Sequence, residues 1–178
     1  YELVDYLGFE KPTEKTYAEW QKHYGLAEDY EMTAEEEGKM FDEFTTTLIT
    51  DFPEFTSPFW NMSRYEDGVH SKKIDVILGG METIGSAERS TDVDMMRDTF
   101  HTITDGEYSQ LLYKLFGKER VEAELEKFLE FDFFERVGGG IGMTRMIAAL
   151  ETLDNDVQVA NGAIAQANQK GLDLHGWK

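Results

Sequence analysis

The spacing of hydrophobic residues predicts helical structure in the first fifty residues. Met40, Phe44 and Leu48 recur at the intervals of one helix face. Thr33 with Glu36 three residues later fits a capping box, in which the hydroxyl and the carboxylate accept hydrogen bonds from free amides of the first turn. We therefore expect this segment, up to about residue 52, to be helical and amphipathic, with its apolar positions in the core.

The pattern changes to strands between residues 52 and 84. Two prolines and four aromatic residues in 52–63 favour an extended, partly buried strand. Turn residues at 65–68 and an apolar run at 74–78 complete a predicted hairpin. Gly79 and Gly80 break the pattern, and a second short strand is expected at 81–84.

Helical spacing returns in the second half of the chain. N-cap residues at 90–92 introduce a helix, and two further helices are expected around 108–115 and 121–129. A strand at 131–137 leads into a glycine run at 138–142, and a helix at 143–153 follows. The remaining tail, 154–178, is rich in Asn, Gln and Gly. The fold class we predict is α+β, an antiparallel sheet flanked by helices in one domain over 1–178.

Charge and composition narrow the classes of function. The 36 Asp and Glu residues against 17 Lys and Arg give a net charge of −19, which repels polyanions such as bare nucleic acid. The absence of cysteine excludes thiol chemistry, and the four histidines lack metal-site spacing, so carboxylates would have to hold any metal, which favours Mg²⁺. The chain shows neither a membrane-spanning run nor a signal peptide, and we expect a cytoplasmic location.

The first candidate site is the series Asp75, Glu82 and Arg89, in which each residue follows the last by seven positions. An odd step along one strand reverses the side-chain direction, but a turn or bulge at Gly79-Gly80 can set the two acids side by side on adjacent strands. Paired carboxylates suit Mg²⁺, and the planar fork of Arg89 suits a carboxylate or amide oxygen. Alternatively, the acids are ordinary surface charges and Arg89 pairs with one of them.

A second candidate is the segment GGGIGMTR at 138–145. Glycines between a strand and a helix let a ligand approach the backbone, and Arg145 in the first helical turn opposes the helix dipole and so favours an anionic partner. Met143 stands where the dinucleotide pattern GxGxxG needs its third glycine. The alternative is a packing turn rich in glycine.

The aromatic segment at 58–71 is a third candidate. Phe59 and Trp60 could form a pocket wall, and Arg64 could reach a phosphate. Core packing of the aromatics and an ion pair of Arg64 with Glu66 or Asp67 are the alternative interpretation.

Taken in order, FWNM, EDG, DV, GGMETIGSAER and GGGIGMTR resemble the second half of the catalytic domain of class II aminoacyl-tRNA synthetases of the Asp, Asn and Lys subclass. The similarity covers roughly residues 52–153. It is closest to asparaginyl- and aspartyl-tRNA synthetases and to relatives without tRNA activity, such as the ammonia-dependent asparagine synthetase. The resemblance implies the C-terminal part of such a domain and an ATP- and Mg²⁺-dependent activation of aspartate or asparagine as the adenylate.

The resemblance also implies roles for individual residues. It assigns Mg²⁺ to Asp75 and Glu82, the amino acid to Arg89, Gly140 and Ser86, and ATP to Glu82, Gly142 and Arg145, with Arg145 as the catalytic residue.

Departures from the family pattern leave alternatives open. Synthetases usually carry an acid at the position of Thr144. The ammonia-dependent asparagine synthetase, a relative that does not charge tRNA, also has a small hydroxyl residue there. Neither motif 1 nor motif 2 is found, and Arg64-Tyr65-Glu66 has the form of motif 2 in the wrong place. A non-catalytic paralogue that binds an amino acid or a nucleotide is therefore the second hypothesis. tRNA is a possible partner that the charge does not favour, and a homodimer would have to form through parts not in this chain.

Overall fold

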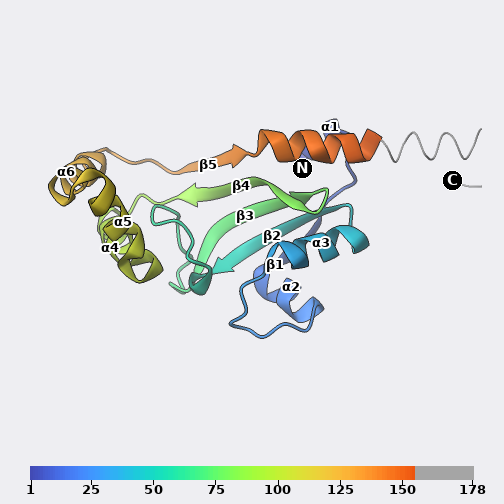
Figure 1. Cartoon of the computed structure of the whole chain (residues 1–178), viewed down its shortest axis with the longest axis horizontal. Coiled ribbons are helices and arrows are strands. Elements are labelled where there is room, and N and C mark those ends of the chain that lie inside the picture. The colour runs from blue at the N-terminus through green and yellow to red at the C-terminus, as the bar shows by residue number, and fades with distance from the viewer. Residues whose placement is uncertain (155–178) are drawn as a thin grey trace, which may run out of the picture.

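A five-stranded sheet with the order β1-β2-β3-β4-β5 organises the chain (Figure 1). The computed structural model describes residues 1–154. β1 runs parallel to β2, whereas every other neighbouring pair is antiparallel. The prediction was an antiparallel sheet, and the observed sheet differs from it at the β1 edge. The strands are β1 (Thr13–Thr16), β2 (Thr46–Pro53), β3 (His70–Leu78), β4 (Met81–Arg89) and β5 (Arg136–Ile141).

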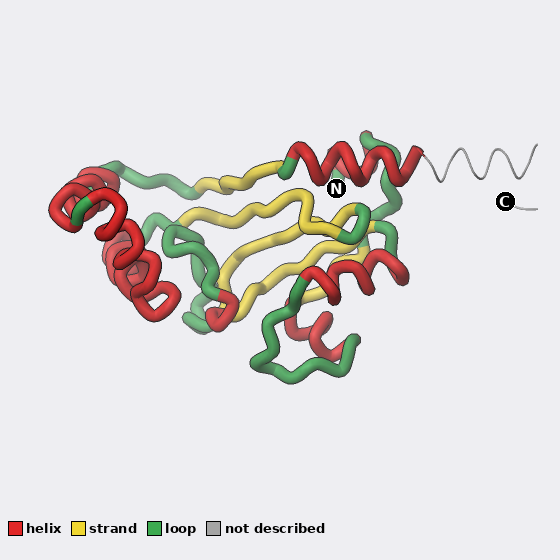
Figure 2. The backbone as a smooth tube through the Cα atoms, in the orientation of Figure 1, coloured by secondary structure: helices red, strands yellow, loops and turns green. Residues whose placement is uncertain are grey.

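Helices cover both faces of the sheet and form a separate group at one end (Figure 2). No helix among residues 1–154 is long and apolar enough to cross a membrane. The helices are α1 (Glu2–Tyr6), α2 (Tyr17–His23), α3 (Ala34–Glu43), α4 (Val93–Thr102), α5 (Glu107–Phe116) and α6 (Lys118–Leu129), with 3-10 turns η1 (Glu54–Thr56) and η2 (Ile103–Gly106) and a last helix at 143–154.

The capping box predicted at Thr33 is present at the start of α3. The Thr33 hydroxyl accepts from the α3 backbone, and the Glu36 carboxylate accepts from the Thr33 amide at 2.9 Å. The helix is shorter than predicted, because it ends at Glu43 and Leu48 lies in β2. The expectation of a wholly helical first segment was wrong, since β1 and β2 both fall within it.

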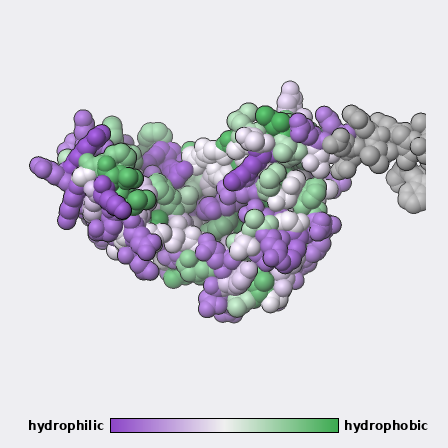
Figure 3. All heavy atoms as spheres, viewed as in Figure 1, coloured by the Kyte–Doolittle hydropathy of each residue, from purple (hydrophilic) through white to green (hydrophobic). Residues whose placement is uncertain are grey.

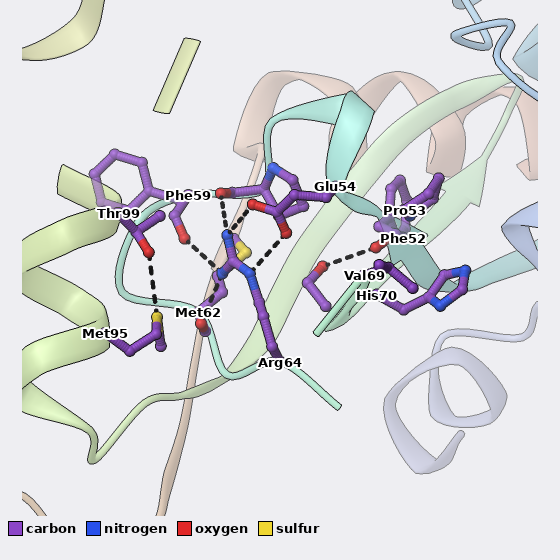
Figure 4. A network of polar contacts seen from close by, with 12 residues as sticks. Phe52, Pro53, Glu54, Phe59, Met62, Arg64, Val69, His70, Met95 and Thr99 are labelled. Atoms are coloured by element: carbon purple, nitrogen blue, oxygen red, sulfur yellow. Dashed lines mark hydrogen bonds and ion pairs between the residues drawn. The ribbon is translucent and has the colours of Figure 1, made fainter. Parts of the chain in front are cut away.

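The segment 52–63 was also predicted wrongly, because β2 ends at Pro53 and η1 and a loop follow. Arg64 organises this loop (Figure 4): it donates to both carboxylate oxygens of Glu54 at 2.9 Å and to the carbonyl of Met62 at 2.7 Å. It also donates to the carbonyl of Pro58. These contacts satisfy the irregular backbone in place of a strand ladder. Arg64 therefore pairs with Glu54, not with Glu66 or Asp67, and is not free to bind a phosphate.

The two sheet faces are packed by different helices. On one face, which we call the site face, α2 and α3 bury an apolar cluster that includes Trp20, Met40, Ile49 and Ile77. On the opposite face, α1 and the helix at 143–154 pack against β2 and β3; Figure 1 shows these two helices close together. The opposite-face cluster comprises Val4, Phe9, Leu48, Val76, Leu78, Met146 and Ala149.

The three helices α4, α5 and α6 fold together beyond the end of the sheet, close to the predicted ranges. Trp60 belongs to their core, with its ring against Phe100 and Phe128, which favours the packing interpretation over a pocket wall. Several large apolar side chains of α5 remain exposed, and Figure 3 shows hydrophobic residues gathered over this end of the molecule. The predicted strand at 131–137 begins later, because β5 spans Arg136–Ile141 and contains the first three glycines of the run.

Candidate functional site

The hairpin of β3 and β4 brings Asp75 and Glu82 to the site face. Gly79 and Gly80 have φ angles of 60° and 75°, the left-handed conformation that a two-residue hairpin turn requires. The turn pairs Leu78 with Met81 and therefore Ile77 with Glu82. Ile77 and Asp75 are two residues apart and share a face, so Glu82 lies on that face too. The turn thus places Asp75 and Glu82, seven residues apart, on the same face, as the spacing predicted.

A bulge in β4 places Arg89 on the same face as Glu82, although seven residues separate them. The register changes from Ile77 opposite Glu82 to Val76 opposite Ile84, which leaves Thr83 as the extra residue. The Thr83 hydroxyl donates to the Met81 carbonyl at 3.0 Å. Beyond the bulge, side-chain directions are inverted relative to a regular strand, and Arg89 joins the site face, about 13 Å along β4 from Gly85.

The carboxylates of Asp75 and Glu82 converge on Gly85, and we call them the carboxylate pair. A Cβ atom at position 85 would lie 2.7 Å from Oε1 of Glu82 and 3.4 Å from Oδ1 of Asp75. Glycine at this position therefore leaves the space that the two carboxylates occupy. The bulge creates this arrangement, because without it Ile84 would stand opposite Asp75 on the site face.

Asp75 is buried and only half satisfied. Its side chain is 7% exposed; Oδ2 accepts from Nζ of Lys73 at 2.5 Å, and Oδ1 is buried without a hydrogen-bond partner in the described part of the chain. Burial raises the pKa of Asp75 to about 6; the nearby Lys73 lowers it, and the charges of Glu82 and Glu37 raise it further. A buried acceptor without a donor is costly unless a ligand completes it.

The residues present fit a magnesium ion that also binds a phosphate. Within 1–154, no three acidic, histidine or cysteine side chains converge closely enough to hold a metal by themselves. Mg²⁺ commonly takes one or two protein carboxylates and fills its other positions with water and substrate phosphate oxygens. The carboxylate pair, with the unpaired Oδ1 of Asp75, supplies that number of ligands.

Arg89 presents a guanidinium that is held in place but not neutralised. Nη1 donates to Oδ1 of Asn61 at 2.9 Å, and Nη2 donates to the Gly138 carbonyl at 3.2 Å. Arg89 of β4 pairs with Arg136 of β5. Burial and the like charge of Arg136 lower the pKa of Arg89. Arg89 takes part in no ion pair among the described residues, so the alternative in which it pairs with an acid does not hold. The guanidinium can accept an anionic or amide ligand.

The glycines of β5 differ in what surrounds them. A Cβ at Gly138 would lie 2.9 Å from Nε of Arg89, and one at Gly139 would lie 2.7 Å from Cβ of Ser86. Gly140 is exposed, and a Cβ there would meet no atom within 4 Å. Close packing thus explains the first two glycines, whereas Gly140 leaves open space above the strand.

Arg145 and Gly142 contact the backbone of the β4 bulge. Nη1 of Arg145 donates to the Glu82 carbonyl at 2.6 Å, and the Gly142 amide donates to the Thr83 carbonyl at 2.8 Å. The Arg145 side chain is 54% exposed, so its other donors remain accessible.

Ser86 is not brought to the site face. Ser86 pairs with Ile74 of β3 and with Gly139 of β5, and it is one residue beyond Gly85, so its side chain points to the opposite face. Its hydroxyl donates to the Ile74 carbonyl at 3.4 Å. Its predicted contact with an amino acid has no support in this geometry.

Three residues near the site were missed from the sequence. Lys73 could have been found, because it precedes Asp75 by two positions and so shares its face. Asn61, which holds Arg89, and Glu37, whose carboxylate accepts from the Glu82 amide at 3.1 Å, come from distant segments and carry no local signal.

Comparisons with known proteins identify a matching family. The model of the family "tRNA synthetases class II (D, K and N)" matches residues 4–160. No curated protein sequence matches the chain.

Solved structures share the fold at low sequence identity. Asparaginyl-tRNA synthetase from Pyrococcus horikoshii is similar with a TM-score of 0.61 and 18% identity, over 82% of this chain and 34% of that one. Aspartyl-tRNA synthetase from Entamoeba histolytica gives 0.59 and 17%, over 79% of this chain and 29% of that one. The Pyrococcus enzyme has also been solved with asparaginyl-adenylate. The chain spans about a third of the length of these proteins.

Proposed function

Because the chain belongs to the class II tRNA synthetases of the D, K and N group, we propose that it forms part of a ligase site that activates aspartate or asparagine with ATP. The observation that supports this most is the shared face of the carboxylate pair and Arg89. Among the described residues, the buried Oδ1 of Asp75 has no hydrogen-bond partner and Arg89 has no counter-ion, and both groups lie on the same face of the sheet. These groups complement a cation and an acidic or amide side chain.

Each group has a place in the proposed reaction. A substrate carboxylate attacks the α-phosphorus of ATP, which gives an acyl-adenylate and releases pyrophosphate. Bound Mg²⁺ would neutralise phosphate charge at the carboxylate pair. Arg89 binds the side-chain oxygen of the amino acid through its planar fork, and the accessible donors of Arg145 bind a phosphate of ATP. Gly140 leaves room for the ligand above β5.

The experiment is ATP–pyrophosphate exchange in a protein that contains the whole catalytic domain. We expect exchange in the presence of Mg²⁺ with aspartate or asparagine. Lysine is the matched control substrate, because its ammonium group would face the positive charge of Arg89. The proposal would be contradicted if neither aspartate nor asparagine supported exchange, or if lysine alone did.

A non-catalytic, ligand-binding paralogue is the second candidate, and Arg145 favours it in one respect. Its Nη1 already donates to the Glu82 carbonyl, so the guanidinium serves the fold even without ATP. Calorimetry separates the candidates: a regulatory module binds the amino acid or ATP without releasing pyrophosphate, whereas the ligase releases it.

The acceptor, the assembly and the location belong to the same proposal. A net charge of −19 favours a small acceptor such as ammonia over tRNA. Measuring ammonia-dependent asparagine formation beside tRNA charging tests this choice. We further propose a cytoplasmic homodimer joined through segments outside this chain, which sedimentation of the longer protein would test.

A further inference from the structure

Glu37 contributes a third carboxylate close to the carboxylate pair. It lies on α3, which packs on the site face, and its Oε2 accepts the backbone amide of Glu82 at 3.1 Å. Burial raises the pKa of Glu37, while the hydrogen bond from the Glu82 amide lowers it. The charge of Glu82 also raises this pKa, and those of Arg145 and Lys73 lower it. The charged groups with the largest effect on the pKa of Glu37 thus belong to the candidate site.

The Glu82 backbone is held by side chains on both sides. Its amide donates to Glu37, and its carbonyl accepts from Nη1 of Arg145 at 2.6 Å. Glu82 immediately precedes the bulge residue Thr83, where the regular strand ladder is interrupted. The two contacts therefore fix the residue whose carboxylate must point toward Gly85.

We propose that Glu37 is a positioning residue for a divalent cation at the carboxylate pair, because it orients Glu82 through its backbone amide and adds negative charge. The second observation that indicates a cation is the buried Oδ1 of Asp75, which has no hydrogen-bond partner among residues 1–154. Glu37 acts through Glu82 and not as a ligand, since no three such side chains in 1–154 converge on one point. The inference rests on the proposed assignment of the carboxylate pair to a divalent cation.

The test measures binding of Mn²⁺ alone to the full chain, by electron paramagnetic resonance of the free ion. Glu37→Ala removes both the acceptor and the charge, and we expect at least a tenfold loss of affinity, as for other residues that orient metal ligands. Glu37→Gln keeps an acceptor for the Glu82 amide and loses only the charge, so we expect about a threefold loss. This partial rescue distinguishes orientation of Glu82 from a simple charge effect.

Glu35→Gln is the matched control. Glu35 lies on the same helix, is exposed and pairs with Lys39 at 2.9 Å, so this variant loses the same charge away from the site. We expect Mn²⁺ affinity equal to that of the unmodified chain. If Glu35→Gln weakens binding as much as Glu37→Gln, or if Glu37→Ala binds normally, the inference is overturned. Should Glu37→Ala unfold, wild-type affinity in a folded Glu37→Gln would overturn it as well.

The result also separates this inference from the proposed function. If the unmodified chain shows no saturable Mn²⁺ binding, both the cation site and the role of Glu37 are overturned. If the Mn²⁺ series behaves as expected while the longer protein shows no ATP–pyrophosphate exchange, only the ligase activity is contradicted.

Discussion

The two halves of the site face contrast sharply, although β3 contributes to both. Over β1, β2 and part of β3, α2 and α3 cover the sheet, and Trp20, Met40 and Ile77 are almost completely buried. Over β5 and the end of β4 the face carries Arg89 beside glycines and is more open: α3 reaches only the start of β4, where Glu37 accepts from the Glu82 amide, whereas Arg89 is half-buried and Gly140 is exposed. The covered half provides stability, and the open half is available for ligands. Substitutions in the two halves should therefore affect different measurements.

The largest effect is expected for Trp20→Ala in the covered half. Trp20 is 0% exposed, and its Nε1 donates to the Leu48 carbonyl at 3.1 Å. Loss of this side chain should reduce the free energy of unfolding by about 3–5 kcal/mol, measured by urea denaturation. A loss below about 1 kcal/mol would show that the covered half does not carry the stability we assign to it.

Next in size is Arg89→Ala in the open half. Removal of a charge-assisted fork should weaken binding of aspartate or asparagine by about 10- to 100-fold, while unfolding changes by about 1 kcal/mol or less. Calorimetry on a protein with the complete catalytic domain measures the binding. Arg89→Lys is the control, because it keeps the charge and loses the fork. Full binding by Arg89→Lys would refute the importance of the planar geometry.

A pH-dependent effect of similar size is expected from the protonation of Asp75. Its folded pKa, about 6, lies above the ordinary value of 3.8, so its contribution to stability is largest below pH 4 and is lost as the pH rises through 6. Without divalent cations, we expect Asp75→Asn to gain about 1–3 kcal/mol relative to the unmodified chain between pH 4 and pH 7. Thermal unfolding across this range measures the difference. A difference that does not vary with pH would contradict the raised pKa.

The smallest effect concerns the glycines of β5. Gly140→Ala should change the free energy of unfolding by under about 0.5 kcal/mol, because a Cβ there meets no neighbour within 4 Å. Gly138→Ala is the matched comparison, since its Cβ would lie 2.9 Å from Nε of Arg89 and should displace that side chain. Thermal melting of both variants checks this. Equal melting temperatures would mean that Arg89 adjusts without cost.

Local sequence patterns predicted some parts of the molecule and missed others for physical reasons. The capping box at Thr33 and the helices between 93 and 129 have periodic or capping signals within a few residues. β1 has no such signal, because its four residues gain their strand character by pairing with β2. Spacing and the glycine turn were enough to place Asp75 beside Glu82. Nothing local indicated that Glu37 or Asn61 would reach the site, since long-range packing brings them there.

The turn at Gly79-Gly80 and the bulge at Thr83 together act as a length constraint on the chain. Each converts an odd interval into a common direction, so at intervals of seven residues Asp75, Glu82 and Arg89 share one face only while the turn and the bulge are both kept. If Thr83 joined the regular ladder, Ile84 would stand opposite Asp75 and Arg89 would turn toward the opposite face. Outside its glycines, the segment 75–89 can therefore accept many substitutions, whereas a one-residue insertion or deletion between the bulge and Arg89 would turn Arg89 to the opposite face. Spacing, more than the identity of the intervening residues, should identify distant relatives that keep this arrangement.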